Sequence, residues 1–227
     1  MLRTELILEN PGSGAARPQA QAELIILGAE LPPDPKLQLR VAGLFLRAQD
    51  YEHALSEYQK GLQIDRHNAE ALAGAGFAAF KLGRYRTAQR YLQSDIGANP
   101  NDAQTAQLLQ IASLILQSDP FARGVSSSDR IRRINAAFTQ AGERLDSCAR
   151  TKDIDITTSS SALGSLKAQW LATKPQLKQL NSDSAIGDAT MDLVFQIEET
   201  TEKECASPNG LDQALLLLAE NRSGVDQ

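Results

Sequence analysis

Residues 50–65 are DYEHALSEYQKGLQID, and residues 83–100 are GRYRTAQRYLQSDIGANP. When residues 35–68 are placed above residues 69–102, the two blocks align without a gap. The alignment pairs residues of the same kind: Tyr51 with Tyr85, Ala54 with Ala88, and Leu62 with Ile96. The sequence therefore repeats with a period of 34 residues. A period of this length is typical of chains built from repeated structural units.

Apolar residues within each unit recur at intervals of three and four, which predicts helices rather than strands. The first stripe is Leu37, Val41, Leu44 and Ala48, and the second is Ala54, Tyr58 and Leu62. Gln49 and Gly83 occupy the same place in the two units, between the stripes, and predict a turn. Each unit is therefore expected to be a pair of helices.

These two stretches resemble the tetratricopeptide repeat, a helix-turn-helix unit of about 34 residues. The resemblance covers residues 35–102. It implies an all-α fold in which helical hairpins stack into a right-handed superhelix. It also implies that ligands bind the concave face, which the first helix of each unit lines.

Three regions are expected along the chain. They are a degraded N-terminal repeat or cap over 1–34, a solenoid over 35–117 (units 35–68 and 69–102, and a partial unit 103–117), and a C-terminal helical region over 118–227. The C-terminal region is expected to pack on the solenoid or cap it.

Helices are also predicted in the regions that flank the repeats. The expected features are a helix over 17–30, a helix capped by Ser128 that runs to Cys148, a linker over 157–161, a helix over 162–181 that Pro175 kinks or splits, a helix over 184–204, and a last helix that starts at Ser207-Pro208.

On the family precedent, a mostly apolar groove lies on the first helices. Its predicted lining is Leu39, Leu46, Arg47, Phe77, Phe80, Lys81, Ile111 and Leu114. An apolar groove favours an amphipathic helix or an apolar peptide segment of a partner protein. In the alternative hypothesis the chain is a structural module of a larger, exported protein, and its own C-terminal helices fill the groove. The sequence does not determine the partner or the oligomeric state.

No catalytic, cofactor or metal site is predicted. The chain has two histidines and two cysteines, and they lack the close spacing of zinc ligands. Gly74-Ala-Gly76 resembles part of a dinucleotide-binding fingerprint, but it falls inside a predicted helix instead of following a strand. An enzyme with acids such as Asp183, Asp188 and Asp192 at its site is a rival hypothesis. A non-enzymatic scaffold is favoured.

The net charge of −5 argues against nucleic-acid binding, which requires a basic surface. The longest apolar run, residues 214–219, is too short to cross a bilayer, so no direct membrane insertion is expected.

A cluster of arginines at positions 123, 130, 132 and 133 is compatible with phosphate binding, but a solvated face with acidic partners in the C-terminal region is favoured.

Cys148 and Cys205 lie near the ends of two predicted helices. If the intervening helix returns antiparallel, both cysteines lie at the same end of the bundle and a disulfide can form. Two separate buried thiols are the other hypothesis. The localisation depends on this choice, because the cytoplasm keeps thiols reduced, whereas a disulfide indicates the periplasm or cell envelope and a signal that has been removed.

Overall fold

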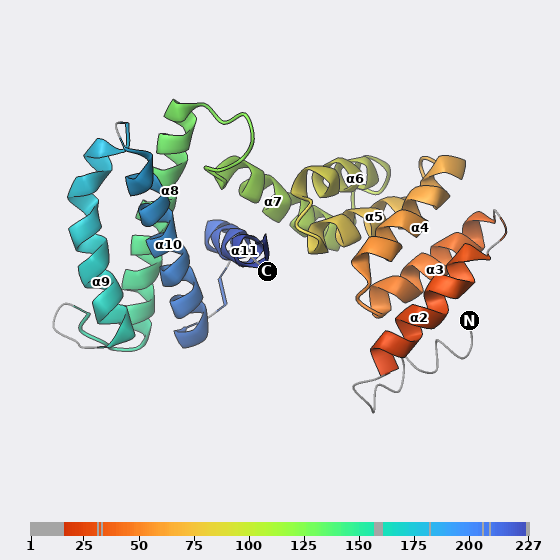
Figure 1. Ribbon diagram of the computed structural model, residues 1–227, viewed down its shortest axis with the longest axis horizontal. Helices are drawn as coiled ribbons and strands as arrows, with labels where there is room; N and C mark the ends of the chain where they lie inside the picture. Colours follow the sequence, from red (N-terminus) through yellow and green to blue (C-terminus); the bar gives the residue numbers. More distant parts are fainter. Residues whose placement is uncertain are drawn as a thin grey trace. The chain divides into compact units, whose positions relative to one another are not determined.

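The structure is a computed structural model of the 227-residue chain, and it describes residues 16–30, 32, 34–156, 161–181, 183–205, 207–208 and 210–225. All regular elements of these residues are helical, which confirms the all-α prediction (Figure 1). The chain divides into two compact units, Met1–Ala112 and Ser113–Gln227. Residues 1–15 of the expected N-terminal repeat or cap and most of the expected linker, residues 157–160, lie outside the described residues.

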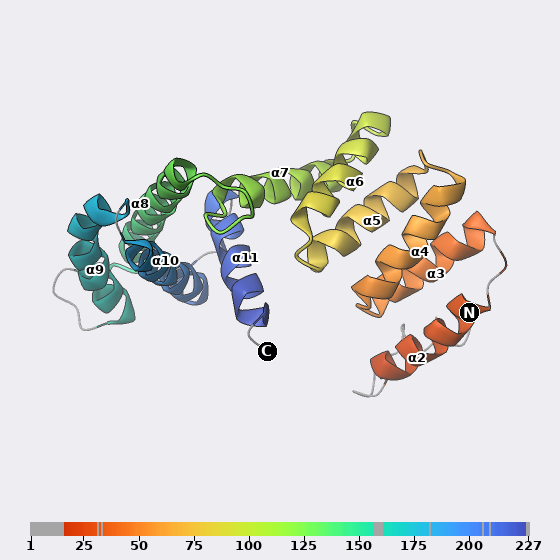
Figure 2. The ribbon, with the colours of Figure 1, turned by 45° about the horizontal axis from the view of Figure 1, so that its top comes forward.

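The first unit consists of successive helices joined by short turns. They are α2 (Ala16–Ala29), α3 (Pro35–Arg47), α4 (Tyr51–Ile64), α5 (Ala69–Lys81), α6 (Tyr85–Ala98) and the first part of α7 (Ala103–Ser118). Both bounds of α5 are those of α3 shifted by one repeat, and the same holds for α6 and α4. Figure 2 shows α3 with α4, and α5 with α6, as successive hairpins. The predicted helical repeat is confirmed.

Local sequence explains where these helices begin and turn. The side chains of Asp34, Asp50 and Asn68 accept hydrogen bonds from backbone amides of the first turns of α3, α4 and α5. Gln49 and Gly83 both adopt a positive φ, of 59° and 68°, and so end α3 and α5 in the same way. Glycine adopts this conformation without steric cost, whereas Gln49 adopts it at a small one.

The second unit contains the end of α7 and a bundle of α8 (Ser127–Thr151), α9 (Ala162–Thr173), the short 3-10 helix η1 (Lys174–Gln179), α10 (Ser184–Glu204) and α11 (Gly210–Val225). An ion pair of 2.7 Å joins Arg130, near the start of α8, to Asp188, near the start of α10. A disulfide joins Cys148, near the end of α8, to Cys205, directly after α10. The two long helices therefore run parallel.

An aromatic stack attaches α9 to this pair of helices. The Trp170 ring lies parallel to the ring of Phe138, with 4.9 Å between the ring centroids. The Trp170 indole Nε1 donates a hydrogen bond of 2.9 Å to the Phe138 carbonyl oxygen. Contact between the buried Phe138 ring and the half-buried Trp170 ring stabilises the bundle, and the hydrogen bond satisfies the polar atom of the indole.

Two details of the predicted helices differ in the structure, and the structure decides between the two alternatives predicted for Pro175. Ser126 caps α8 in place of Ser128. The Ser126 hydroxyl accepts a hydrogen bond from the Asp129 backbone amide, and the Ser126 backbone is still extended, as is usual for the residue before the first helical turn. Pro175 splits the expected helix, so α9 ends at Thr173 and η1 follows. The last helix, α11, begins at Gly210, after the Ser207-Pro208 pair that was expected to start it.

Two carboxyl groups are buried in the second unit, Glu198 on α10 and Asp212 on α11. Glu198 is only 1% exposed, and no hydrogen-bond partner reaches either of its carboxyl oxygens within the described part of the chain. Burial raises the pKa of Glu198 to about 8, the nearby Asp212 adds to the rise, and Arg144 opposes it. Burial also raises the pKa of Asp212, which accepts a hydrogen bond of 2.8 Å from Gln140.

We predict that the second unit loses stability as the pH rises from about 4.5 to about 8. Over this range the folded state keeps a proton on Glu198 that the unfolded state has released, so a higher pH favours unfolding. One unit of pKa corresponds to about 1.4 kcal/mol, so the loss amounts to several kcal/mol. Urea denaturation followed by fluorescence of Trp170, the chain's one tryptophan, measures this unit alone. The Glu198→Gln variant should lose most of this pH dependence, and an unchanged slope would contradict the assignment.

We predict that the Cys148–Cys205 disulfide stabilises the second unit by up to about 4 kcal/mol, because it closes a long loop in the unfolded chain. Urea denaturation followed by Trp170 fluorescence should show this loss in a Cys148→Ser, Cys205→Ser variant. Reduced wild-type protein is the control and should behave like the variant. Thiol titration of the denatured, unreduced protein should find no free thiol, and two reactive thiols would disprove the bond.

Candidate functional site

The first helices of the two full hairpins each present part of one surface. On α3 the residues are Lys36, Gly43, Leu46 and Arg47, and on α5 they are Glu70, Ala73, Phe77 and Lys81; all except Leu46 and Ala73 form equivalent pairs in the two units. Lys36, Gly43 and Arg47 lie on one side of α3 because their spacings of seven and four match whole helical turns. Glu70, Phe77 and Lys81 repeat the same spacing in the next unit. We call this surface the first-helix face.

Three of the predicted groove residues lie in the protein interior. The exposed fractions are 8% for Leu39, 7% for Phe80 and 6% for Ile111. Leu39 packs against Gly61 of α4, and the Phe80 ring meets the edge of Tyr85 with 5.4 Å between the centroids. These side chains therefore stabilise the hairpins, and they contribute little to an open surface.

The remaining predicted residues have different surroundings. Leu46 and Phe77 are half-buried on the first-helix face, and Arg47 and Lys81 on the same face are exposed. Leu114 is half-buried, but it belongs to the second unit. The accessible part of the face thus combines a few apolar groups with charged ones, and it is not the mostly apolar groove that the sequence predicted.

Phe77 is the main aromatic group on this face. Its ring meets the edge of the Tyr51 ring, with 6.3 Å between the centroids, and the Lys81 ammonium lies 5.6 Å from its centroid. Gly43 occupies the equivalent position on α3 and has no side chain to cover the face there. An aromatic surface next to a cation can contact an apolar side chain and a carboxylate at the same time.

Tyr58 of α4 packs against both first helices, behind the first-helix face. Its ring fills the space that a β-carbon on Gly74 of α5 would need, and its hydroxyl lies 3.9 Å from where a β-carbon of Gly43 would be. Burial, and to a lesser degree the negative charge of Glu70, raise the pKa of Tyr58 to about 12. The phenol therefore stays neutral at physiological pH.

Comparison with known proteins agrees with this geometry. The model of a family described as tetratricopeptide repeat matches residues 45–111. These residues belong to the tetratricopeptide repeat family. Over 122 residues, 52% of the chain, the sequence is 31% identical to cellulose synthase 1 operon protein C of Komagataeibacter xylinus. The chain spans 8% of the length of that relative. No solved structure gives a significant match.

The residues that suggested a dinucleotide fingerprint have a packing role in this tetratricopeptide unit. Gly74 and Gly76 lie inside α5, where a β-carbon would overlap Tyr58 in the first case and Leu92 of α6 in the second. The sequence pattern placed both glycines inside a helix, but it did not identify Tyr58 as the neighbour of Gly74. The equivalent residue of the second unit is Leu92, so sequence position alone did not distinguish the tyrosine.

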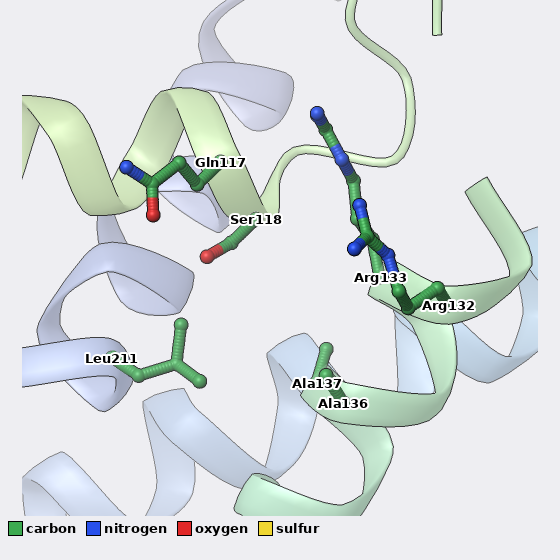
Figure 3. Close-up of a pocket in the computed structure, with 7 residues that line it drawn as sticks. All are labelled: Gln117, Ser118, Arg132, Arg133, Ala136, Ala137 and Leu211. Atoms are coloured by element: carbon green, nitrogen blue, oxygen red, sulfur yellow. The ribbon is translucent and has the colours of Figure 1, made fainter. Parts of the chain in front are cut away.

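The second unit contains a pocket of about 330 Å³ beside the end of α7 (Figure 3). Its lining is Gln117, Ser118, Arg132, Arg133, Ala136, Ala137 and Leu211. Arg133 donates hydrogen bonds to the carbonyl oxygens of Leu116 and Asp119, and Arg132 pairs with Asp129 at 2.7 Å. These arginines therefore secure the ends of helices.

The acids that suggested an enzyme have similar local roles. Asp183 caps α10, Asp188 pairs with Arg130, and Asp192 lies 3.7 Å from Arg222. Among the described residues, no three His, Cys, Asp or Glu side chains are grouped as metal ligands would be. Of the helices in the described ranges, none combines the length and apolar character that a membrane span requires.

We predict that Gly74→Ala destabilises the first unit by about 1 to 3 kcal/mol, because the new methyl group overlaps the buried Tyr58 ring. The matched control is Gly97→Ala in α6, where no atom other than those of its chain neighbours and its own helix backbone lies within 4 Å of the new methyl group. The control should gain up to about 1 kcal/mol from the higher helix propensity of alanine. Urea denaturation followed by circular dichroism measures both variants, and equal stability of the two would contradict the packing at Gly74.

Proposed function

We propose that the first-helix face binds a segment of a partner protein and that this chain is a non-enzymatic interaction module. Tetratricopeptide repeats generally mediate contacts between proteins, and residues 45–111 match that family. The observation that carries the proposal is Phe77, a partly exposed aromatic ring on the face, with the Tyr51 ring in edge-to-face contact and the Lys81 ammonium over the ring.

The proposed ligand is a short helical or extended segment with at least one apolar side chain. Such a side chain would cover the exposed part of Phe77 and the open position at Gly43. Burial of one large apolar side chain contributes about 1.5 to 3 kcal/mol, so a few polar contacts must add to the affinity. Moderate affinity of this kind suits a reversible scaffold.

The disulfide between Cys148 and Cys205 supports a place for this module in an oxidising compartment, such as the bacterial periplasm. The proposal for the first-helix face does not depend on it, because both cysteines belong to the second unit.

A library of random 12-residue peptides displayed on phage tests the function with the full chain. We predict that wild-type protein captures clones that the Phe77→Asp variant binds at least about 30-fold more weakly, the loss typical of a central aromatic contact. The matched control is Ile64→Asp, which places the same charge on an exposed apolar residue at the end of α4. The control should bind the clones as wild type does.

Circular dichroism must first show that both variants are folded. If no captured clone distinguishes Phe77→Asp from Ile64→Asp, the first-helix face does not bind peptide segments. That result would favour the alternative hypothesis, in which the chain is a structural module of a larger protein.

A further inference from the structure

We propose that the segment bound by the first-helix face is acidic, with carboxylates that pair with Arg47 and Lys81. This inference rests on the proposed function and specifies the chemistry of its partner. Arg47 and Lys81 are equivalent residues of successive repeats, and each is the last residue of its helix, α3 or α5. α3 and α5 are in direct contact, so one acidic segment can reach the cations at the ends of both helices.

Neither cation has an acidic partner among the residues that the structure describes. Two other exposed basic residues of the first unit do have such partners: Arg84 pairs with Glu52 at 2.5 Å, and Lys60 pairs with Glu57 at 2.6 Å. Lys36, at the opposite end of α3, likewise has no carboxylate partner in the described part of the chain. The three cations are therefore available to a ligand.

The charge of the face is opposite to that of the chain. Lys36, Arg47 and Lys81 outnumber Glu70, whereas the whole sequence has a net charge of −5. A local excess of one sign attracts ligands of the other sign and repels competitors of the same sign. This arrangement favours acidic segments over neutral segments with the same apolar residue.

The position of Phe77 relative to Lys81 defines the spacing of the ligand. They are separated by one helical turn along α5, and the Lys81 ammonium is 5.6 Å from the ring centroid. A carboxylate that reaches Lys81 therefore lies close to an apolar group that covers Phe77. The expected ligand has an apolar side chain with acidic residues within one turn of it.

The test uses the clones that depend on Phe77 in the phage experiment. We expect their sequences to be enriched in aspartate and glutamate near an apolar residue. A fluorescein-labelled synthetic peptide of the most enriched clone, and a version with every acidic residue changed to its amide, are then titrated by fluorescence anisotropy. The acidic peptide should bind about tenfold more tightly, a difference that 0.5 M salt should largely remove.

Charge reversal on the protein completes the test. Arg47→Glu with Lys81→Glu should weaken binding of the acidic peptide at least tenfold and should leave the amide peptide little changed. The matched control is Arg86→Glu with Arg90→Glu, which makes the same change of net charge on exposed residues of α6. The control should keep the preference for the acidic peptide.

Two outcomes separate this inference from the proposed function. The first is a set of clones that depend on Phe77 but show no acidic enrichment and bind the charge-reversed variant normally. This outcome would overturn the inference and leave the proposed function in place. The absence of any clone that depends on Phe77 would overturn the function, and the inference with it.

Discussion

Close packing of large side chains against glycines of α5 is the constraint on which the repeat unit depends. Tyr58 reaches Gly74 from α4, and Leu92 reaches Gly76 from α6. A β-carbon at either glycine would overlap its neighbour, so α5 is held from both sides at positions where it has no side chain. Buried alanines of the second helices, such as Ala54, permit equally close contacts. A chain poor in aromatic residues can therefore still form a dense core.

This packing determines what the first helices present to solvent. Leu39 and Phe80 turn toward the second helices, and the opposite sides of α3 and α5 carry longer polar residues. Phe77 stays partly exposed, and its equivalent on α3 is Gly43, which has no side chain. The first-helix face thus combines one aromatic contact with cations at the helix ends. Such a surface suits a ligand that supplies both an apolar group and negative charge.

The second unit is held together in a different way. It has no repeat, and its parallel long helices are joined by an ion pair at one end and a disulfide at the other. The Phe138–Trp170 stack attaches α9, and buried acids lie where α11 meets α10. A buried carboxyl that keeps its proton at neutral pH costs less than a buried charge, which explains why Glu198 is tolerated in the core.

The sequence by itself determined the repeated two-helix unit and most helix positions, because apolar spacing, capping residues and turn residues act over a few neighbouring positions. Pro175 shows the limit of such reasoning, since its effect on a helix was expected but the choice between a kink and a split was not.

The tertiary structure decided which residues of the first helices remain accessible, and it brought Cys148 to Cys205 and the Tyr58 ring to Gly74. Exposure, charge balance and pKa depend on side chains that arrive from other helices. A linear pattern specifies which face of a helix is apolar, but only the packed neighbours determine how much of that face a ligand can reach.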